Sequence, residues 1–298
     1  MKHDFPNLFV PGAGKSGTSS LHLYLGRHPG ITMMQVKEPH FFSRDEYYRI
    51  GWDAYLQGYA SGNFKGQYLG ESSTTYFLSV KAITRIQSDI RDPKFIFLLK
   101  NPVDRILSHY NWIRTIGEQL PPFRKEVTDD LSVPFDADQP MQQFYYKSYV
   151  EFSRYGKWIQ HFFSAFGKEN CHILLAEQLE ENPLPALNGC FRFLQLPAME
   201  AITPITENKT KDYFYSERPR TITRLGKKLL PPQIRKKIIA AGVLPFPTTK
   251  KIKVDAPPYI AAAEERKWLR SLLSDDFLHL KKITEIDFSS WTDFYEAG

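Results

Sequence analysis

The stretch that most constrains this chain lies near its N-terminus, where residues 8–21 read Leu-Phe-Val-Pro-Gly-Ala-Gly-Lys-Ser-Gly-Thr-Ser-Ser-Leu. An apolar run ends at Pro11, a glycine-rich turn follows, and small hydroxyl residues open an amphipathic run. This order is typical of a strand, an anion-binding loop and a helix, because glycines let a backbone approach its ligand and turn several N–H groups toward it. The helix N-terminus and Lys15 add positive charge. The stretch therefore predicts a site for a phosphate or a sulfate.

Two other interpretations of this loop stay open from its residues alone. One is a tight turn with a solvated lysine. The other is a nucleoside-triphosphate loop, whose pattern is Gly-x-x-x-x-Gly-Lys-Ser/Thr. Gly14, Lys15 and Ser16 fit the end of that pattern, but Phe9 stands where its first glycine belongs. The loop thus indicates a phosphate group without identifying the molecule that carries it.

The length and composition limit the class of protein. With 298 residues, the chain can form one large α/β domain or two small ones. It has no apolar run of the roughly 18 residues that cross a bilayer, and no apolar signal-peptide core follows Met1. We therefore expect a cytoplasmic protein. Cys171 and Cys190 lie in apolar surroundings without the spacing of a metal site, so we expect reduced, buried thiols.

The net charge of +6 is unevenly distributed. Residues 205–253 hold 13 Lys or Arg and 3 Asp or Glu, a charge of about +10, so the rest of the chain sums to about −4. A local positive field suits an anionic ligand, an anionic substrate or a membrane surface. A solvated basic face is the alternative interpretation.

Apolar strands and helices alternate along the chain. Further strands are expected at 31–34, 68–71, 95–99 and 171–175, and helices at 44–58, 102–116, 149–166, 184–194, 221–241 and 257–274. This alternation predicts an α/β fold with an open, mostly parallel central sheet flanked by helices. Residues 121–140 are expected to form a connection that faces the substrate, and Trp291 is expected to dock the C-terminal tail onto the body.

Charged side chains follow several of these strands. Ligands of open parallel sheets bind beyond the carboxyl ends of the strands, so we expect Lys15, Glu71 and Lys100 to meet at one edge. Ser108 follows Lys100 by eight residues, so a strand-end ammonium and a helix hydroxyl can converge on one anion. A kinase would instead need a metal-binding carboxylate at such a strand end, and Lys100 repels Mg²⁺.

The segment Lys37-Glu38-Pro39-His40 places a carboxylate beside an imidazole. Pro39 disfavours helix at Glu38, so both groups are expected on an extended or turning segment near the strand ends. Such a pair can act as an oriented base. A salt-bridged loop is the alternative for this segment, and a helix N-cap arrangement is the alternative for Glu71.

In their order and spacing these motifs resemble the sulfotransferases that use 3′-phosphoadenosine 5′-phosphosulfate (PAPS), and the resemblance covers nearly the whole chain. Residues 11–21 resemble the family's 5′-phosphosulfate loop, and residues 99–110, Leu-Lys-Asn-Pro-Val-Asp-Arg-Ile-Leu-Ser-His-Tyr, resemble its 3′-phosphate motif. Residues 37–42 are similar to a motif of the glycan-modifying branch, which includes heparan sulfate sulfotransferases. Further similarities lie at 70–73, 155–158, 177–183 and 287–291.

The resemblance implies a P-loop NTPase-like three-layer sandwich. It implies a single sulfotransferase domain over 1–298, with a basic helical region at about 205–253 and a C-terminal helical tail. The implied activity is transfer of a sulfonate group from PAPS to an acceptor hydroxyl or amine, with release of the desulfonated product PAP and no need for a metal. The alternatives are a kinase and a non-enzymatic protein that binds a nucleotide or an anionic membrane.

Expected acceptors are a carbohydrate, a lipid or a small metabolite, and a nucleic acid is not expected. The basic region is expected to cover the site or to contact an anionic surface. The absence of an anchor fits a bacterial cytoplasmic enzyme or a trimmed catalytic domain.

The resemblance also assigns roles to residues. Glu38 is the expected base with His40 as its partner, Glu71 is the reserve base, and Lys15 is expected to stabilise the leaving group. The implied cofactor-binding residues are Gly14, Lys15, Ser16, Gly17, Thr18, Ser19, Lys100, Ser108, Lys209 and Lys211.

Two positions depart from the family's usual pattern. Lys100 stands where an arginine is usual, which keeps the positive charge but loses bidentate phosphate binding. Ser72 replaces the lysine that usually follows the strand glutamate. This second departure leaves Lys37 to supply positive charge near the transferring sulfonate.

Overall fold

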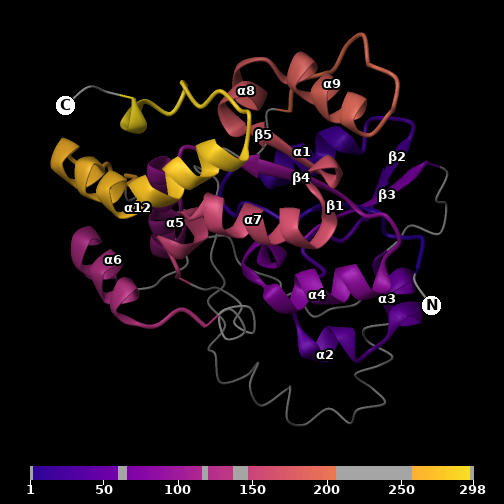
Figure 1. Cartoon of the computed structure of the whole chain (residues 1–298), viewed down its shortest axis with the longest axis horizontal. Helices are drawn as coiled ribbons and strands as arrows, with labels where there is room; N and C mark the ends of the chain where they lie inside the picture. The colour runs from indigo at the N-terminus through magenta and orange to yellow at the C-terminus, as the bar shows by residue number, and fades with distance from the viewer. Residues whose placement is uncertain (1–2, 60–65, 116–119, 137–146, 206–256, 296–298) are drawn as a thin grey trace.

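The computed structural model describes residues 3–59, 66–115, 120–136, 147–205 and 257–295, and the statements below concern those residues. Its centre is a five-stranded sheet in the order β2-β3-β1-β4-β5, in which every neighbouring pair is parallel (Figure 1). The strands are β1 (Leu8–Val10), β2 (Ile31–Met33), β3 (Tyr68–Ser72), β4 (Lys94–Leu99) and β5 (Cys171–Leu175). The predicted parallel sheet is confirmed, and β1, which leads into the glycine-rich loop, is its middle strand.

Helices surround this sheet. The α-helices are α1 (Thr18–Leu25), α2 (Asp45–Tyr48), α3 (Trp52–Tyr59), α4 (Val80–Asp89), α5 (Pro102–Thr115), α6 (Phe123–Ser132), α7 (Tyr155–Phe166), α8 (Ala176–Glu181), α9 (Pro183–Phe193) and α12 (Ala263–Ile283). Short 3₁₀ segments are η1 (Thr74–Leu78), η3 (Glu151–Ser153), η4 (Lys168–Asn170) and η6 (Thr292–Phe294).

Both faces of the sheet are covered, as expected for a parallel sheet with a continuously apolar strand such as β4. Successive side chains of a strand point to opposite faces. Phe95 and Phe97 therefore pack with side chains of α4 and α7, whereas Ile96 and Leu98 pack with side chains of α1 and α9. The predicted three-layer sandwich is confirmed.

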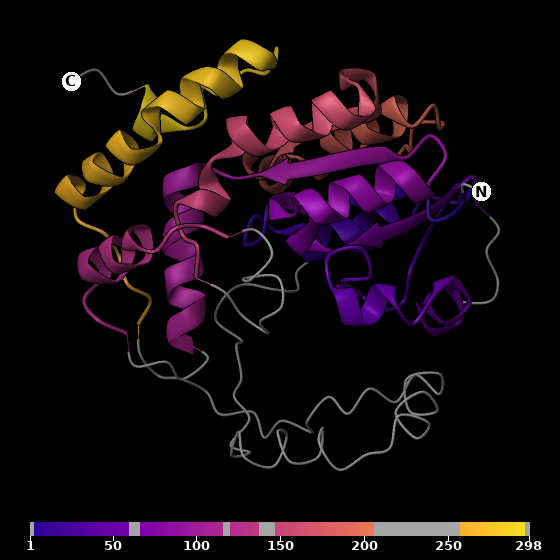
Figure 2. The same cartoon turned by 60° about the horizontal axis from the view of Figure 1, so that its bottom comes forward.

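A further apolar cluster joins α5, α6 and α12 at the end of the molecule where β4 leads into α5 (Figure 2). Residues 121–140 were expected to form a connection that faces the substrate, whereas Phe123–Ser132 within them form α6. Pro122 precedes the helix, and Phe123 and Val127, one turn apart, are buried with Tyr110 and Tyr149. Contacts that are distant in sequence stabilise this short helix, so its own periodicity is a weak signal.

Other boundaries also differ from the predictions. The segment 44–58 forms two helices instead of one, because Gly51 between α2 and α3 has a φ of +94°, outside the helical region. The helix expected from 149 begins at Tyr155, since η3 occupies the preceding residues. The helix expected at 257–274 begins at Ala263 and extends to Ile283. The helices predicted within 221–241 lie outside the described residues.

The C-terminal tail docks onto the body as predicted. Trp291 is fully buried, and its ring centroid lies 5.9 Å from that of Tyr155 in α7 and 4.6 Å from that of Phe288. The tail is therefore part of the apolar core that includes α7.

Two expectations about the whole chain concern its thiols and its relation to membranes. Cys190 is buried, Cys171 is half-buried, and both thiols are free. Within the described residues, no helix combines the length and the apolar character that crossing a membrane requires.

The close approach of α7 to α12 gives a stability prediction. A Cβ atom on Gly156 would lie 2.5 Å from the Asp276 carbonyl oxygen and 2.9 Å from the Leu280 nitrogen. Gly156→Ala should therefore lower the free energy of unfolding, measured by urea denaturation, by about 1–3 kcal/mol. Gly189→Ala in α9 is the matched control, because its Cβ would lie 3.9 Å from the nearest atom, His172 Nε2. The control should raise the free energy of unfolding by about 0.5–1 kcal/mol, and equal changes in both variants would contradict the packing described.

Candidate active site

The glycine-rich loop of residues 11–17 folds back against the end of β4. The Ala13 N–H donates to the Leu98 carbonyl at 2.8 Å, and the Leu98 N–H donates to the Gly12 carbonyl at 2.8 Å. A Cβ atom on Gly14 would lie 2.6 Å from Cε1 of Phe152, so the loop can lie this close to the Phe152 ring only with glycine at that position. The loop is therefore held in one shape by the sheet below it and an aromatic ring beside it.

Lys15 lies in this loop with a φ of +73°, and its ammonium is 5.1 Å from the centroid of the Trp112 ring. Burial, and then the positive charges of Arg105 and Lys37, lower the pKa of Lys15 to about 8. A cation whose pKa is lowered by burial and by neighbouring like charges is stabilised when an anion binds beside it. This electrostatic arrangement fits the predicted phosphate site.

Ser16 gives a second observation that fits such a ligand. Its hydroxyl oxygen is buried and, among the described residues, has no hydrogen-bond partner of good geometry. The nearby Tyr155 phenol donates instead to the Lys100 carbonyl at 2.9 Å. A buried hydroxyl with an unused donor is suited to a phosphate oxygen. Thr18 is buried and Ser19 is half-buried in the first turn of α1, directly after the loop.

Arg105, on α5, is a functional residue that the sequence interpretation missed. Its guanidinium is fully buried and donates to the Ser153 hydroxyl at 2.6 Å, to the Gly14 carbonyl at 3.5 Å and to the Tyr149 carbonyl. Arg105 therefore links the loop and the segment before α7 to helix α5. Its positive charge also acts on Lys15. Val103, Ile106, Leu107 and Tyr110 form the apolar stripe of α5, whereas Arg105 lies on another side of the helix, over the Phe152 ring, so the helix periodicity did not indicate its burial.

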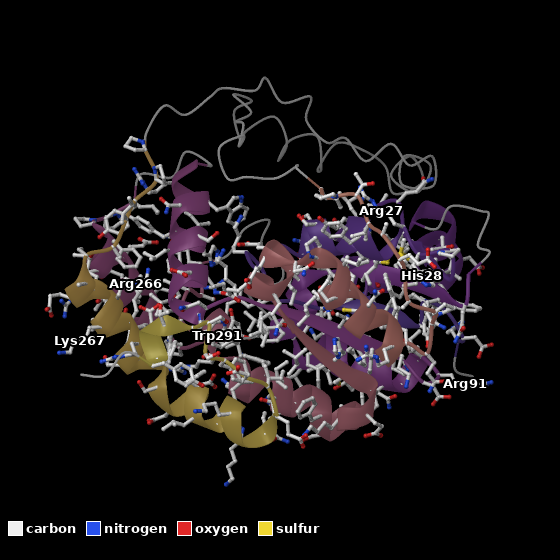
Figure 3. All side chains as sticks on the ribbon, turned by 90° about the horizontal axis from the view of Figure 1, so that it is seen from above. Arg27, His28, Arg91, Arg266, Lys267 and Trp291 are labelled. Carbon is white, nitrogen blue, oxygen red and sulfur yellow. The ribbon has the colours of Figure 1, made fainter. Side chains whose placement is uncertain are left out.

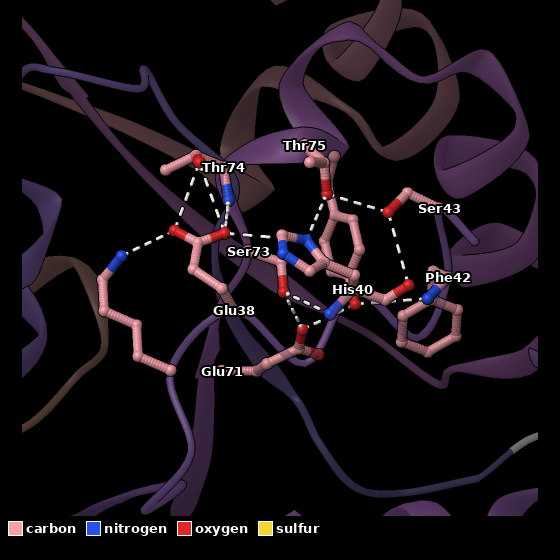
Figure 4. Close-up of polar contacts among 10 residues, drawn as sticks. Glu38, His40, Phe42, Ser43, Glu71, Ser73, Thr74 and Thr75 are labelled. Atoms are coloured by element: carbon pink, nitrogen blue, oxygen red, sulfur yellow. Dashed lines mark hydrogen bonds and ion pairs between the residues drawn. The ribbon is translucent and has the colours of Figure 1, made fainter. Parts of the chain in front are cut away.

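Glu38 and His40 lie together in a turn beside the end of β3 (Figure 4). Glu38 Oε2 accepts from the Thr74 N–H at 2.8 Å, Oε1 accepts from Lys37 Nζ at 2.6 Å, and His40 Nδ1 is 3.7 Å from Oε2. Burial pushes the pKa of Glu38 upward, but the Lys37 and His40 charges and these hydrogen bonds outweigh it, so the pKa lies below its usual value. Burial also lowers the pKa of His40 to about 4. At neutral pH the turn therefore carries an ionised carboxylate and a neutral imidazole.

Glu71 lies near Glu38 but in a different environment. Its side chain is fully buried and accepts from Ser73 Oγ and the Tyr76 hydroxyl, both at 2.6 Å, and from the Tyr55 hydroxyl. Burial raises the pKa of Glu71 to about 7, although the three hydroxyl donors oppose that rise. The carboxyl group thus faces the protein interior and not the solvent side of the turn.

Ser72, which directly follows Glu71, forms a neutral pair with His22 at the position where the resemblance would place a lysine. Ser72 Oγ and His22 Nδ1 are 2.8 Å apart and both residues are buried. Burial, and then the charge of Lys37, lower the pKa of His22 to about 4, so the imidazole is neutral. Lys37 is close enough to affect the pKa of Lys15, His22 and His40 while it pairs with Glu38. The prediction that Lys37 supplies the missing charge agrees with this position.

Lys100 and Ser108 lie at the end of β4 and in α5. Lys100 Nζ is 3.6 Å from Oε1 of the largely exposed Glu180, and Ser108 is half-buried. Their convergence on one anion stays a prediction. Lys209 and Lys211 lie outside the described residues.

A network from distant parts of the chain fixes the backbone that carries Lys100. The Asn101 N–H donates to Glu177 Oε1 at 2.8 Å, and its side-chain amide donates to Asp293 Oδ2 at 2.8 Å. Trp291 Nε1 donates to the other Glu177 oxygen at 3.1 Å, and Arg266 of α12 binds Asp293 through two hydrogen bonds. Figure 3 shows Arg266 and Trp291 on the α12 side of the molecule. The C-terminal tail therefore helps to position the end of β4.

Comparisons with known proteins identify the family to which the sequence is similar. The family model described as a sulfotransferase domain matches residues 5–237. Human heparan sulfate glucosamine 3-O-sulfotransferase 6 is 26% identical over 209 residues, which are 70% of this chain and 58% of that protein. The mouse protein of the same name is 32% identical over 120 residues, 40% of this chain and 34% of that protein. The chain thus spans less than two thirds of the length of these relatives.

A solved structure agrees on the fold. The crystal structure of a sulfotransferase from Alicyclobacillus acidocaldarius superposes with a TM-score of 0.66 at 22% identity, covering 97% of this chain and 100% of that one. The family match covers well over half of the sequence and includes β1 to β5 with the loop after β1. The chain therefore belongs to the sulfotransferase domain family.

Proposed function

We propose that this protein transfers a sulfonate group from PAPS to a hydroxyl or amine of an acceptor and releases PAP. The observation that carries the proposal is the position of Lys37, between the anion-binding loop and the candidate base. Its ammonium donates to Glu38 at 2.6 Å, and its charge lowers the pKa of Lys15. Lys15 of the loop and the ionised carboxylate of Glu38 are therefore both close to the Lys37 ammonium. This proximity would bring a donor bound at the loop near the base, and in-line transfer needs both substrates held close together.

The residues of the loop fit the 5′-phosphate end of PAPS. The close contact of Gly14 with Phe152, the buried Ser16 hydroxyl and the clustered positive charges are the features that support this assignment. PAPS supplies the activated sulfonate when it is bound. Lys15 and the loop N–H groups would hold the 5′-phosphate and stabilise the charge that develops on it. Lys100 and Ser108 would hold the 3′-phosphate.

Glu38 is the proposed base. It is ionised at neutral pH, and its carboxylate is half-buried, so it remains accessible from the solvent side. His40, neutral at that pH, would orient the acceptor hydroxyl by a hydrogen bond. When the Lys37 ammonium turns toward a bound sulfonate, Glu38 loses its strongest ionic partner and becomes a better proton acceptor.

The proposed acceptor is a carbohydrate. The similar human and mouse proteins are heparan sulfate glucosamine 3-O-sulfotransferases, which supports a glycan hydroxyl or amine as the acceptor group. The charge of about +10 in residues 205–253 (13 basic and 3 acidic residues) supports an anionic acceptor.

We also propose that the enzyme acts in the cytoplasm.

The test of this function is turnover with PAPS and a pooled set of heparan oligosaccharides, glycolipids and phenols, with the products identified by mass spectrometry.

Glu38→Gln should lower kcat by about 100-fold or more, because it removes the base. Lys15→Ala should lower kcat/KM for PAPS by a similar factor. Lys125→Ala is the matched surface control, since Lys125 is exposed and pairs with Asp129 of its own helix. Turnover that survives Lys15→Ala, or no sulfonated product from any acceptor, would overturn the proposal.

The buried cations also give a prediction that needs no turnover. The Lys15 ammonium should titrate near pH 8 in the ligand-free protein, measured by NMR of ¹³C-methylated lysines and assigned with Lys15→Arg. Lys37→Met removes a like charge, so it should move this midpoint upward, whereas Lys37→Arg should leave it near 8. A midpoint that is the same in all three proteins would show that Lys37 is not close to Lys15.

A further inference from the structure

We infer that Glu71 is a positioning residue, which fixes the turn carrying Glu38 and His40 through two hydroxyl groups and does not itself take the acceptor's proton. The inference rests on the proposed function, because it concerns the site in which Glu38 acts as the base. It assigns different roles to the two carboxylates that the sequence left as competing candidates. Figure 4 shows the hydrogen bonds that join Ser73 to the Glu71 carboxylate and to the backbone of His40.

The Glu71 carboxylate lies at the start of two relays to the backbone of the turn. Ser73 Oγ donates to Glu71 Oε1 at 2.6 Å and accepts from the His40 N–H at 3.1 Å. The Tyr76 hydroxyl donates to the same oxygen at 2.6 Å and accepts from the Phe42 N–H at 3.2 Å. Through the two hydroxyl groups, one carboxylate oxygen of Glu71 therefore orients the acceptors of the backbone N–H groups of His40 and Phe42.

The direction of these hydrogen bonds follows from the chemistry of the groups. An ionised carboxylate only accepts hydrogen bonds, whereas a hydroxyl group has one proton and can also accept. Above pH 7, where Glu71 is ionised, Ser73 and Tyr76 therefore give their protons to Glu71, and their lone pairs are left for the backbone N–H groups of His40 and Phe42. A neutral amide at position 71 could reverse either hydroxyl and break the corresponding relay.

The turn needs such support because its backbone is unusual. Glu38 has a φ of +60° and His40 a φ of +55°, in the left-handed region that residues with a side chain rarely adopt. Conformations of this kind persist only where the surroundings hold them, and they concentrate at functional sites. The residues that clamp this turn, 72–76, directly follow Glu71 in the chain.

The surroundings of Glu71 do not suit direct proton transfer with an acceptor. Its side chain is fully buried, and both of its oxygens already accept from hydroxyl groups, Oε2 from Tyr55. Phe41 stacks on the Tyr55 ring at a centroid distance of 4.1 Å, and Phe42 lies 5.7 Å from the Tyr76 ring. These aromatic rings separate the carboxylate from solvent, whereas Glu38 is half-exposed at the same turn.

The first test measures the turn itself, with hydrogen–deuterium exchange of the amides of His40 and Phe42 at pH 8, where Glu71 is ionised because its pKa is about 7. Glu71→Gln should speed exchange at both amides by about fivefold or more. Tyr76→Phe should speed it mainly at Phe42, and Ser73→Ala mainly at His40. Tyr55→Phe is the matched control, because it deletes a phenol that donates to Glu71 but lies outside both relays. Exchange that is unchanged in Glu71→Gln would overturn the inference.

The second test measures catalysis in the same variants. Glu71→Gln should lower kcat by about tenfold, leave PAP affinity unchanged, and keep the acid limb of the pH–rate profile that Glu38 produces. Loss of that limb in Glu71→Gln, together with its survival in Glu38→Gln, would make Glu71 the base and overturn the inference. A wild-type protein that neither binds PAP nor uses PAPS would overturn the proposed function alone, because the exchange experiment would still decide the role of Glu71.

Discussion

The repulsion among positive charges at the glycine-rich loop is the constraint on which this site depends. Arg105 is fully buried, and Lys15 and Lys37 are half-buried. Burial, and then the charges of Arg105 and Lys37, lower the pKa of Lys15 to about 8. Arg105 donates to the Gly14 and Tyr149 carbonyls and to the Ser153 hydroxyl. An anion bound at the loop would be attracted by the positive potential of these side chains and would relieve the repulsion on Lys15.

The arrangement of the carboxylates is consistent with this potential. Glu38 faces the cations and is ionised, while Glu71 is enclosed by hydroxyl groups and aromatic rings. The neutral His22–Ser72 pair adds no charge, and the charge of Lys37 acts on both His22 and His40. The two carboxylates therefore differ in environment: Glu38 is half-buried and paired with Lys37, and Glu71 is fully buried among hydroxyl groups.

The sequence predicted the scaffold better than it predicted the site. Continuously apolar strands such as 95–99 and the glycine-rich loop carry their own signals, so the sheet and the loop were correctly predicted. α6 and the break at Gly51 were missed because distant contacts and one backbone angle determine them. Arg105 and the links from Trp291 and Asp293 to the end of β4 join segments far apart in the chain, and no local pattern reports such contacts.

The most direct test of the account is calorimetric titration of the protein with PAP and with AMP in the presence of EDTA. The two ligands differ only in the 3′-phosphate, so they separate a PAPS-type site from a general 5′-phosphate loop. The account predicts that PAP binds without metal, at least about tenfold more tightly than AMP, and that Lys15→Ala weakens both. Equal affinities for PAP and AMP, or binding of PAP that requires Mg²⁺, would contradict it.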